Sequence, residues 1–111
     1  PASVRPGVAS SPAEELYGDQ TLSWWVENFR LKRQALQDLE SSYAAKKQYA
    51  GVFEGGRRMG QIFGAAEVDT YEKYKKQIPE DEKKLETLKD DIEEFRRKAE
   101  INGVPKEIRG E

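Results

Sequence analysis

Apolar and aromatic residues recur at alternating steps of three and four along the second half of the chain, between Tyr71 and Ala99. This spacing places them on one line along a helix. The members of this second apolar line are Tyr71, Tyr74, Ile78, Leu85, Leu88, Ile92, Phe95 and Ala99. Asp81 interrupts the line, and most residues between its members are charged. A helix of this kind needs a partner surface to bury its apolar line.

The first half of the chain carries another line with the same spacing. It consists of Leu22, Trp25, Phe29, Leu36, Leu39, Tyr43, Ala50 and Phe53, with Lys32 and Lys46 at its two polar positions. Asp19 or Thr21 would cap the helix, which no Pro or Gly interrupts before Gly51. Such a helix of roughly 32 to 35 residues would be about 50 Å long. The two lines predict an all-α fold in which two long helices form an antiparallel coiled-coil hairpin.

The two predicted helices carry net charges of opposite sign. Residues 21–58 contain seven Lys and Arg against four Asp and Glu, a surplus of three positive charges. Residues 67–102 contain nine against twelve, a deficit of three. Opposite charge favours pairing of the two helices within one chain over pairing of like helices, although one exposed ion pair contributes only about 0.2 to 1 kcal/mol.

A register follows from aligning the two lines so that the numbers of facing residues add up to about 124. Facing pairs are then Trp25 and Ala99, Phe29 and Phe95, Leu36 and Leu88, and Leu39 and Leu85. Tyr43 faces Asp81 and gives its carboxylate a hydroxyl donor, and Lys46 faces Ile78. A sum of about 117 would place Leu36 opposite Asp81. We therefore expect the register of 124.

The turn falls in the glycine-rich segment 51–64, and we place it at about residues 55–66. Gly56, Gly60 and Gly64 recur every four residues. On a helix, this spacing would expose a strip of backbone that permits close helix packing. A flexible turn and a close-packing helix face are therefore both open, and we favour the turn.

The return helix is predicted to begin at Asp69, which has capping-box spacing to Glu72. Pro79 lies inside the pattern, and the apolar line keeps its phase across it, so we expect a kink in a continuing helix. Asn102 and Gly103 are typical of a left-handed helix stop.

The predicted domain organisation is a hairpin at residues 19–103 with two short flanks. Residues 1–18 form an extended lead-in with a short N-terminal helix that begins at Ser11, or else a disordered tail. Residues 104–111 form a tail, in which Lys106 to Glu111 are either frayed or a truncated junction. The chain begins at Pro1 without Met, which suggests a removed leader or excision from a longer chain, and the sequence does not indicate a compartment.

Composition narrows the function classes. The chain has 111 residues, of which 36% are hydrophobic and 36% charged, a profile typical of long helices and coiled coils. Its 19 basic and 21 acidic residues leave a net charge of −2, which argues against nucleic-acid binding. No apolar run is long enough to span a membrane, which takes about 18 residues.

Catalytic and metal-binding chemistry has few candidates, because the chain contains no Cys and no His. Thiolate nucleophiles, imidazole bases and the common zinc ligands are therefore missing. Carboxylates are abundant but interleave with Lys and Arg, as on a solvated helix face. We expect no enzyme activity, no catalytic residues, no metal and no cofactor.

Two surfaces are candidates for partner binding. Trp24 adjoins Trp25 of the apolar line, so it should point away from the hairpin, with Leu31 one heptad later. Either a partner covers them, or Leu16 and Tyr17 of the same chain do. The second surface is the glycine-rich tip, whose candidate residues are Arg57, Arg58, Met59, Ile62 and Phe63. Its arginines could bind an anion, but the phosphate-loop motif is missing. We therefore favour a hinge with two solvated arginines.

These observations favour a non-enzymatic helical interaction or structural protein, an accessory or scaffold subunit of a larger assembly. The partner would be another protein or a second copy of this chain. The alternative is a reversible regulator or inhibitor of a partner enzyme that binds through the Trp24 and Leu31 face or through the glycine-rich tip.

Overall fold

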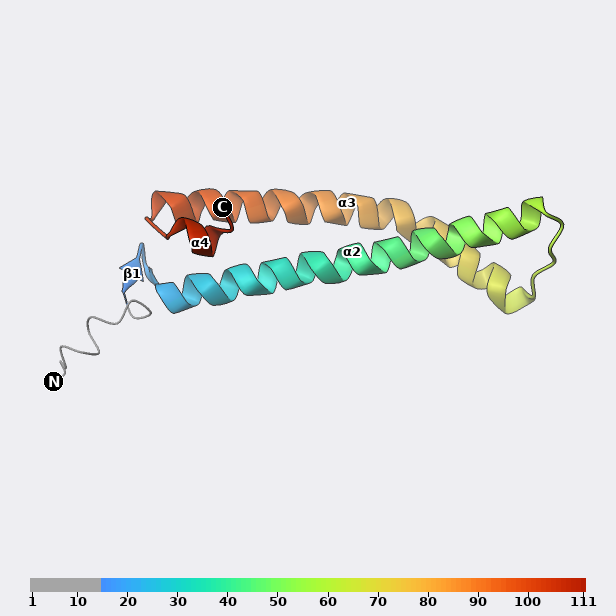
Figure 1. Ribbon diagram of the computed structural model, residues 1–111, viewed down its shortest axis with the longest axis horizontal. Helices are drawn as coiled ribbons and strands as arrows, with labels where there is room; N and C mark the ends of the chain where they lie inside the picture. Colours follow the sequence, from blue (N-terminus) through green and yellow to red (C-terminus); the bar gives the residue numbers. More distant parts are fainter. Residues whose placement is uncertain (1–14) are drawn as a thin grey trace. The chain divides into compact units, whose positions relative to one another are not determined.

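The computed structural model describes residues 15–111 and confirms the predicted all-α hairpin class (Figure 1). Two helices of 37 residues each pack antiparallel against each other. The elements in chain order are β1 (Leu16–Tyr17), β2 (Gln20–Thr21), α2 (Leu22–Arg58), α3 (Ala65–Ile101) and α4 (Lys106–Arg109). Every residue of the two predicted apolar lines is buried or half-buried. Within the described residues, no helix is long and apolar enough to cross a membrane.

The described residues divide into two compact units, and each contains part of both long helices. The open-end unit comprises residues 15–34 and 89–111, and the turn-end unit comprises residues 35–88. The predicted division into a lead-in, a hairpin and a tail stays a prediction.

The open-end unit has an aromatic core where the start of α2 packs against the end of α3. Its buried members are Trp25, Phe29, Ala99 and Val104. The Phe29 ring lies 4.8 Å from the Phe95 ring in an edge-to-face arrangement, as the register of 124 predicts. Thr21 caps α2, because its hydroxyl oxygen accepts a hydrogen bond from the Trp24 N–H at 3.1 Å.

The turn-end unit keeps the same register but pairs its polar residues differently from our expectation. Lys46 Nζ lies 2.7 Å from Asp81 Oδ2, and both side chains are largely buried. The Tyr43 hydroxyl donates to Glu82 at 2.6 Å, so the predicted Tyr43 to Asp81 contact is wrong. The long Lys46 side chain reaches past its facing position, Ile78, and supplies the opposite charge that a buried carboxylate requires.

The turn is shorter than predicted, because α2 continues to Arg58 and leaves only residues 59–64 between the helices. Gly60 has a φ of 85°, and the Gln61 N–H donates to the Gly56 carbonyl oxygen at 2.8 Å, which completes a left-handed helix stop. Gly56 therefore lies in the helix, and Gly60 lies in the turn. The segment therefore forms a turn, as favoured, and in the part of the chain that the structure describes no second helix packs on its glycines, because the neighbours of Gly56 are the turn residues Gln61 and Phe63.

For α3, the predicted start is wrong, and the predicted continuation of the helix through Pro79 is confirmed. The helix begins at Ala65 and not at Asp69, because the Glu67 carboxylate accepts a hydrogen bond from the Gly64 N–H at 3.1 Å. Pro79 lies inside α3, which continues through it and changes direction near it within the turn-end unit (Figure 1).

The flanks of the hairpin differ from the sequence-based expectation. The start of the predicted N-terminal helix lies outside the described residues. Its end is no helix, because β1 pairs with β2 across a turn in which Gly18 has a φ of 71°.

After Gly103, which ends α3 with a φ of 80° as predicted, the chain is packed and not frayed. Val104 is 2% exposed, and its N–H donates to the Ala99 carbonyl oxygen. The short helix α4 follows, and the buried Arg109 guanidinium donates to the Val104 carbonyl oxygen at 2.9 Å.

Candidate functional site

Trp24 covers the core of the open-end unit and does not point away from the hairpin. Its ring lies 5.0 Å from the Trp25 ring and 5.9 Å from the Phe95 ring. The side chain is half-buried, because Phe95 is large enough to reach its flank. Leu31 is 51% exposed and matches its predicted outward position. Whether this face binds a partner stays a prediction.

The predicted cover by the N-terminal segment is formed in part. Tyr17 packs against the open-end core, and its carbonyl oxygen accepts a hydrogen bond from Trp25 Nε1 at 2.9 Å. Leu16 is 67% exposed and contributes little cover. The open-end unit therefore retains four exposed large apolar side chains, Leu16, Val26, Leu31 and Ile101, the last at 83% exposure.

The turn-end tip exposes its apolar residues most completely. Met59 is 89% exposed and Ile62 is 94% exposed. Phe63 is half-buried, because its ring stacks on Phe53 with a centroid distance of 4.3 Å. Val52, which we did not select from the sequence, is also 68% exposed. Met59, Ile62 and Phe63 all lie in the turn between α2 and α3, and Phe63 is less exposed than expected.

The two candidate arginines have different surroundings. The Arg57 guanidinium lies over the Phe53 ring at 4.5 Å and 5.6 Å from the centre of the Tyr71 ring. This cation–π placement ties Arg57 to the aromatic cluster. Arg58 is exposed in the last turn of α2.

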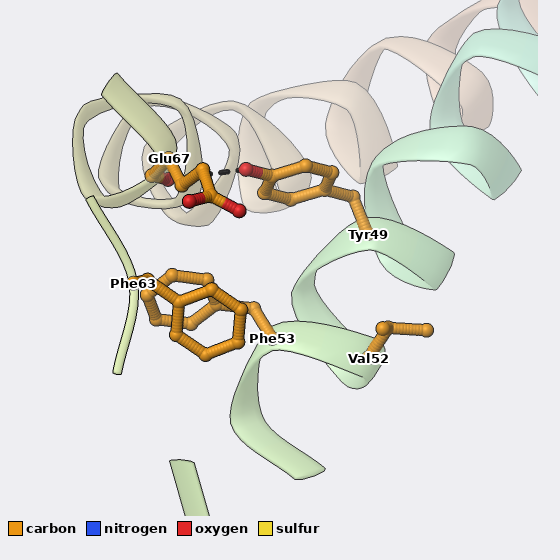
Figure 2. A pocket seen from close by; sticks show the side chains of 5 residues that line it. All are labelled: Tyr49, Val52, Phe53, Phe63 and Glu67. Carbon is orange, nitrogen blue, oxygen red and sulfur yellow. Dashed lines mark hydrogen bonds between the residues drawn. The ribbon is translucent and has the colours of Figure 1, made fainter. Parts of the chain in front are cut away.

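An aromatic hollow beside the tip was missed by the sequence analysis. It encloses about 120 Å³, and Figure 2 shows the side chains that line it, which are Tyr49, Val52, Phe53, Phe63 and Glu67. The Tyr49 hydroxyl donates to the Glu67 carbonyl oxygen at 3.1 Å, which links α2 to the start of α3. Tyr49 and Phe53 are near-parallel, with centroids 6.4 Å apart.

The hollow depends on a glycine of α2. A Cβ added at Gly56 would lie 2.8 Å from the Phe63 ring, so only glycine lets that ring approach the helix. The spacing of Tyr49 and Phe53, four residues apart on one helix, was a usable signal for this cluster. Phe63 and Glu67 could not be added, because their positions depend on the turn.

Near the turn, Glu54 has two charged or polar partners on α3. Its carboxylate accepts a hydrogen bond from the Tyr71 hydroxyl at 2.5 Å and pairs with Lys75 Nζ at 3.2 Å. These partners, Tyr71 first and then Lys75, lower the pKa of Glu54 below its ordinary value. The same hydrogen bond raises the pKa of Tyr71.

Residues 15–111 contain no group of three or more Asp and Glu side chains placed to hold a metal ion. With no His or Cys in the sequence, the side chains that the fold gathers are aromatic, aliphatic and charged surface groups. They can support cation–π, apolar and ion-pair contacts.

No protein-family model matches the chain, and comparisons with curated proteins and with solved structures give no significant match.

Proposed function

We propose that this chain is a non-enzymatic helical interaction protein, an accessory or scaffold subunit whose turn-end tip contacts a protein partner. The observation that supports the proposal most directly is the exposure of Met59 and Ile62, at 89% and 94%, beside the half-buried Phe63. Clustered exposed apolar side chains are typical of interaction sites, and large apolar anchors supply most of the energy at protein interfaces.

The small extent of the tip supports the alternative of a reversible regulator. Stable protein interfaces bury about 1,200 to 2,000 Å² in total, and transient ones bury less. A tip formed by Met59, Ile62 and Phe63 would need further surface, such as Arg58, to reach the stable range. The lifetime of the complex therefore separates a permanent subunit from a regulator.

The test is co-purification of the tagged chain from its native source, with wild-type protein beside a Met59→Ser/Ile62→Ser variant. We expect one partner at fixed stoichiometry with the wild type and its loss with the variant. Leu31→Ser is the matched control, because it removes an exposed apolar side chain from the open-end unit.

Two outcomes would contradict the tip assignment: equal recovery of the partner with the tip variant, or loss only with Leu31→Ser. Sedimentation of the purified chain at micromolar concentration tests the remaining possibility that a second copy is the partner.

A further inference from the structure

We propose that the hollow at the turn end binds a methylated ammonium group, the head of a methyl-lysine side chain on the partner. This inference rests on the proposed function only in assigning the ammonium to a protein. The hollow itself combines three aromatic rings, the aliphatic Val52 and the carboxylate of Glu67, and its lining contains no basic residue. Figure 2 shows the Glu67 carboxylate turned toward the space between Tyr49 and the pair of phenylalanine rings.

The lining favours a cation because aromatic faces carry negative potential. A cation within about 6 Å of a ring centre is attracted to it, most strongly where water is excluded. The Phe53 ring is already occupied, because Phe63 and Tyr71 stack on it at centroid distances of 4.3 and 4.2 Å and the Arg57 guanidinium lies 4.5 Å from its centre. The attraction of a ligand cation would therefore come mainly from the rings of Tyr49 and Phe63. The negative charge of Glu67 at the same hollow adds to the attraction.

The lining favours a methylated ammonium over a bare one because it offers few hydrogen-bond acceptors. A bare ammonium has three donors that need partners when it leaves water. Glu67 Oε1 already accepts from the Gly64 N–H, and the Tyr49 hydroxyl already donates to the Glu67 carbonyl oxygen, which leaves Glu67 Oε2 as the main acceptor for those three donors. A trimethylammonium group has no donor, and its methyl groups contact rings and Val52 directly.

The size of the hollow restricts the ligand to such a head group. Pockets for drug-sized ligands enclose about 300 to 1,000 Å³. The hollow here encloses about 120 Å³, so the rest of the ligand must lie outside it. The exposed Met59 and Ile62 of the turn offer apolar surface for flanking residues of a partner.

The test is an NMR titration with tetramethylammonium chloride at constant ionic strength, in which the Val52 methyl groups and the rings of Tyr49 and Phe63 are observed. Neopentyl alcohol is the matched uncharged probe, because it has a similar shape without the charge. We expect saturable shifts with the cation and at least tenfold weaker binding of the alcohol.

Variants separate the parts of the hollow. Phe63→Leu and Glu67→Gln should each weaken cation binding several-fold, whereas Tyr49→Phe keeps the ring and should retain most of it. Leu31→Ala in the open-end unit is the control that should leave the titration unchanged. Thermal unfolding of each variant shows whether it is folded under the conditions of the titration.

Two outcomes would overturn the proposal. Equal binding of the alcohol would make the hollow an apolar socket, and the absence of saturable shifts with folded wild-type protein would mean that it holds no such ligand. If the cation binds, acetylated trimethyl-lysine amide is compared with unmodified lysine amide and with choline. Preference for trimethyl-lysine supports the assignment to a protein side chain, and preference for choline contradicts it.

The experiments distinguish an error in the ammonium-site proposal from an error in the proposed function. The Met59→Ser/Ile62→Ser variant tests partner binding through the tip without using the hollow. A partner lost with that variant but retained with Glu67→Gln would leave the interaction protein in place and remove the ammonium site.

Discussion

The two units of this protein surround the same pair of helices with different amounts of additional structure. The open-end unit adds β1, β2 and α4, and these elements leave Trp25 at 5% exposure and Val104 at 2%. The turn-end unit adds only a six-residue turn at 59–64. Its tip leaves Met59 and Ile62 exposed. The further chain at the open end completes an aromatic core, although Leu16, Leu31 and Ile101 of the same unit stay exposed.

The units also differ in how they use buried charge. In the open-end unit, the Arg109 guanidinium secures α4 by donating to the Val104 carbonyl oxygen and pairing with Glu100 and Glu111. In the turn-end unit, the Lys46 to Asp81 pair lies within the apolar line itself. The first arrangement attaches a covering element, and the second places two opposite charges at the polar interruptions of the two apolar lines.

The largest expected effect is loss of the open-end core. Phe29 is 1% exposed, so Phe29→Ala removes a fully packed ring and should lower the free energy of unfolding by about 3 to 5 kcal/mol. Phe63→Ala is the counterpart in the turn-end unit, where the half-buried ring should cost less, about 1 to 2 kcal/mol. Urea denaturation followed by circular dichroism measures both. Equal losses would mean that the two ends do not differ in packing.

The second effect concerns the buried ion pair. Lys46→Leu leaves the Asp81 carboxylate, whose side chain is 6% exposed, without its cation and should destabilise the protein by about 3 kcal/mol. The double variant Lys46→Leu/Asp81→Leu should be at least as stable as the wild type, because two apolar residues replace two desolvated charges.

Denaturation gives the stabilities, and sedimentation tests specificity. We expect the double variant to populate additional oligomers, since nothing polar then opposes other pairings along the apolar line. A single wild-type-like species would show that apolar shape alone sets the register.

The apolar lines predicted the helices and their register because burial against a partner repeats with the helical period. The pairing of Lys46 was missed because position along a helix does not show how far a long side chain reaches. The position of Trp24 was predicted wrongly for a similar reason, since Phe95 is large enough for its ring to contact the Trp24 ring. The short strands β1 and β2 have too few residues for an alternating pattern to be visible.

The aromatic hollow was beyond sequence reasoning for a different reason. Its members Tyr49 and Phe53 lie on α2, whereas Phe63 and Glu67 follow the turn. Their meeting depends on a helix stop at Gly60. The helix-stop signal could have been found, but the ring placement that it produces could not.

Two helical glycines of the turn-end unit provide a smaller test. A Cβ at Gly51 meets nothing within 4 Å, so Gly51→Ala should stabilise the protein by about 0.5 to 1 kcal/mol through helix propensity. A Cβ at Gly56 meets the Phe63 ring at 2.8 Å, so Gly56→Ala should destabilise it by about 1 kcal/mol or more. Thermal and urea unfolding of the two variants gives the sign of each change. Stabilisation by both would mean that Phe63 can move away without cost.

The smallest expected effect is the pH dependence that Glu54 contributes to the turn-end unit. Its pKa is lowered in the folded protein, mainly by the Tyr71 hydroxyl and then by Lys75, relative to an ordinary value of 4.5. Its stabilisation is therefore complete above about pH 4.5 and is lost as pH falls through the lower folded pKa. Melting temperatures of wild type and Glu54→Gln should differ at pH 7 and converge toward pH 3. Tyr71→Phe, which keeps the ring but removes the main hydrogen bond, should reduce the same difference. If the difference in melting temperature between wild type and Glu54→Gln did not change with pH, the effect of the substitution would come from packing. Only the ionised carboxylate carries the charge that Lys75 attracts.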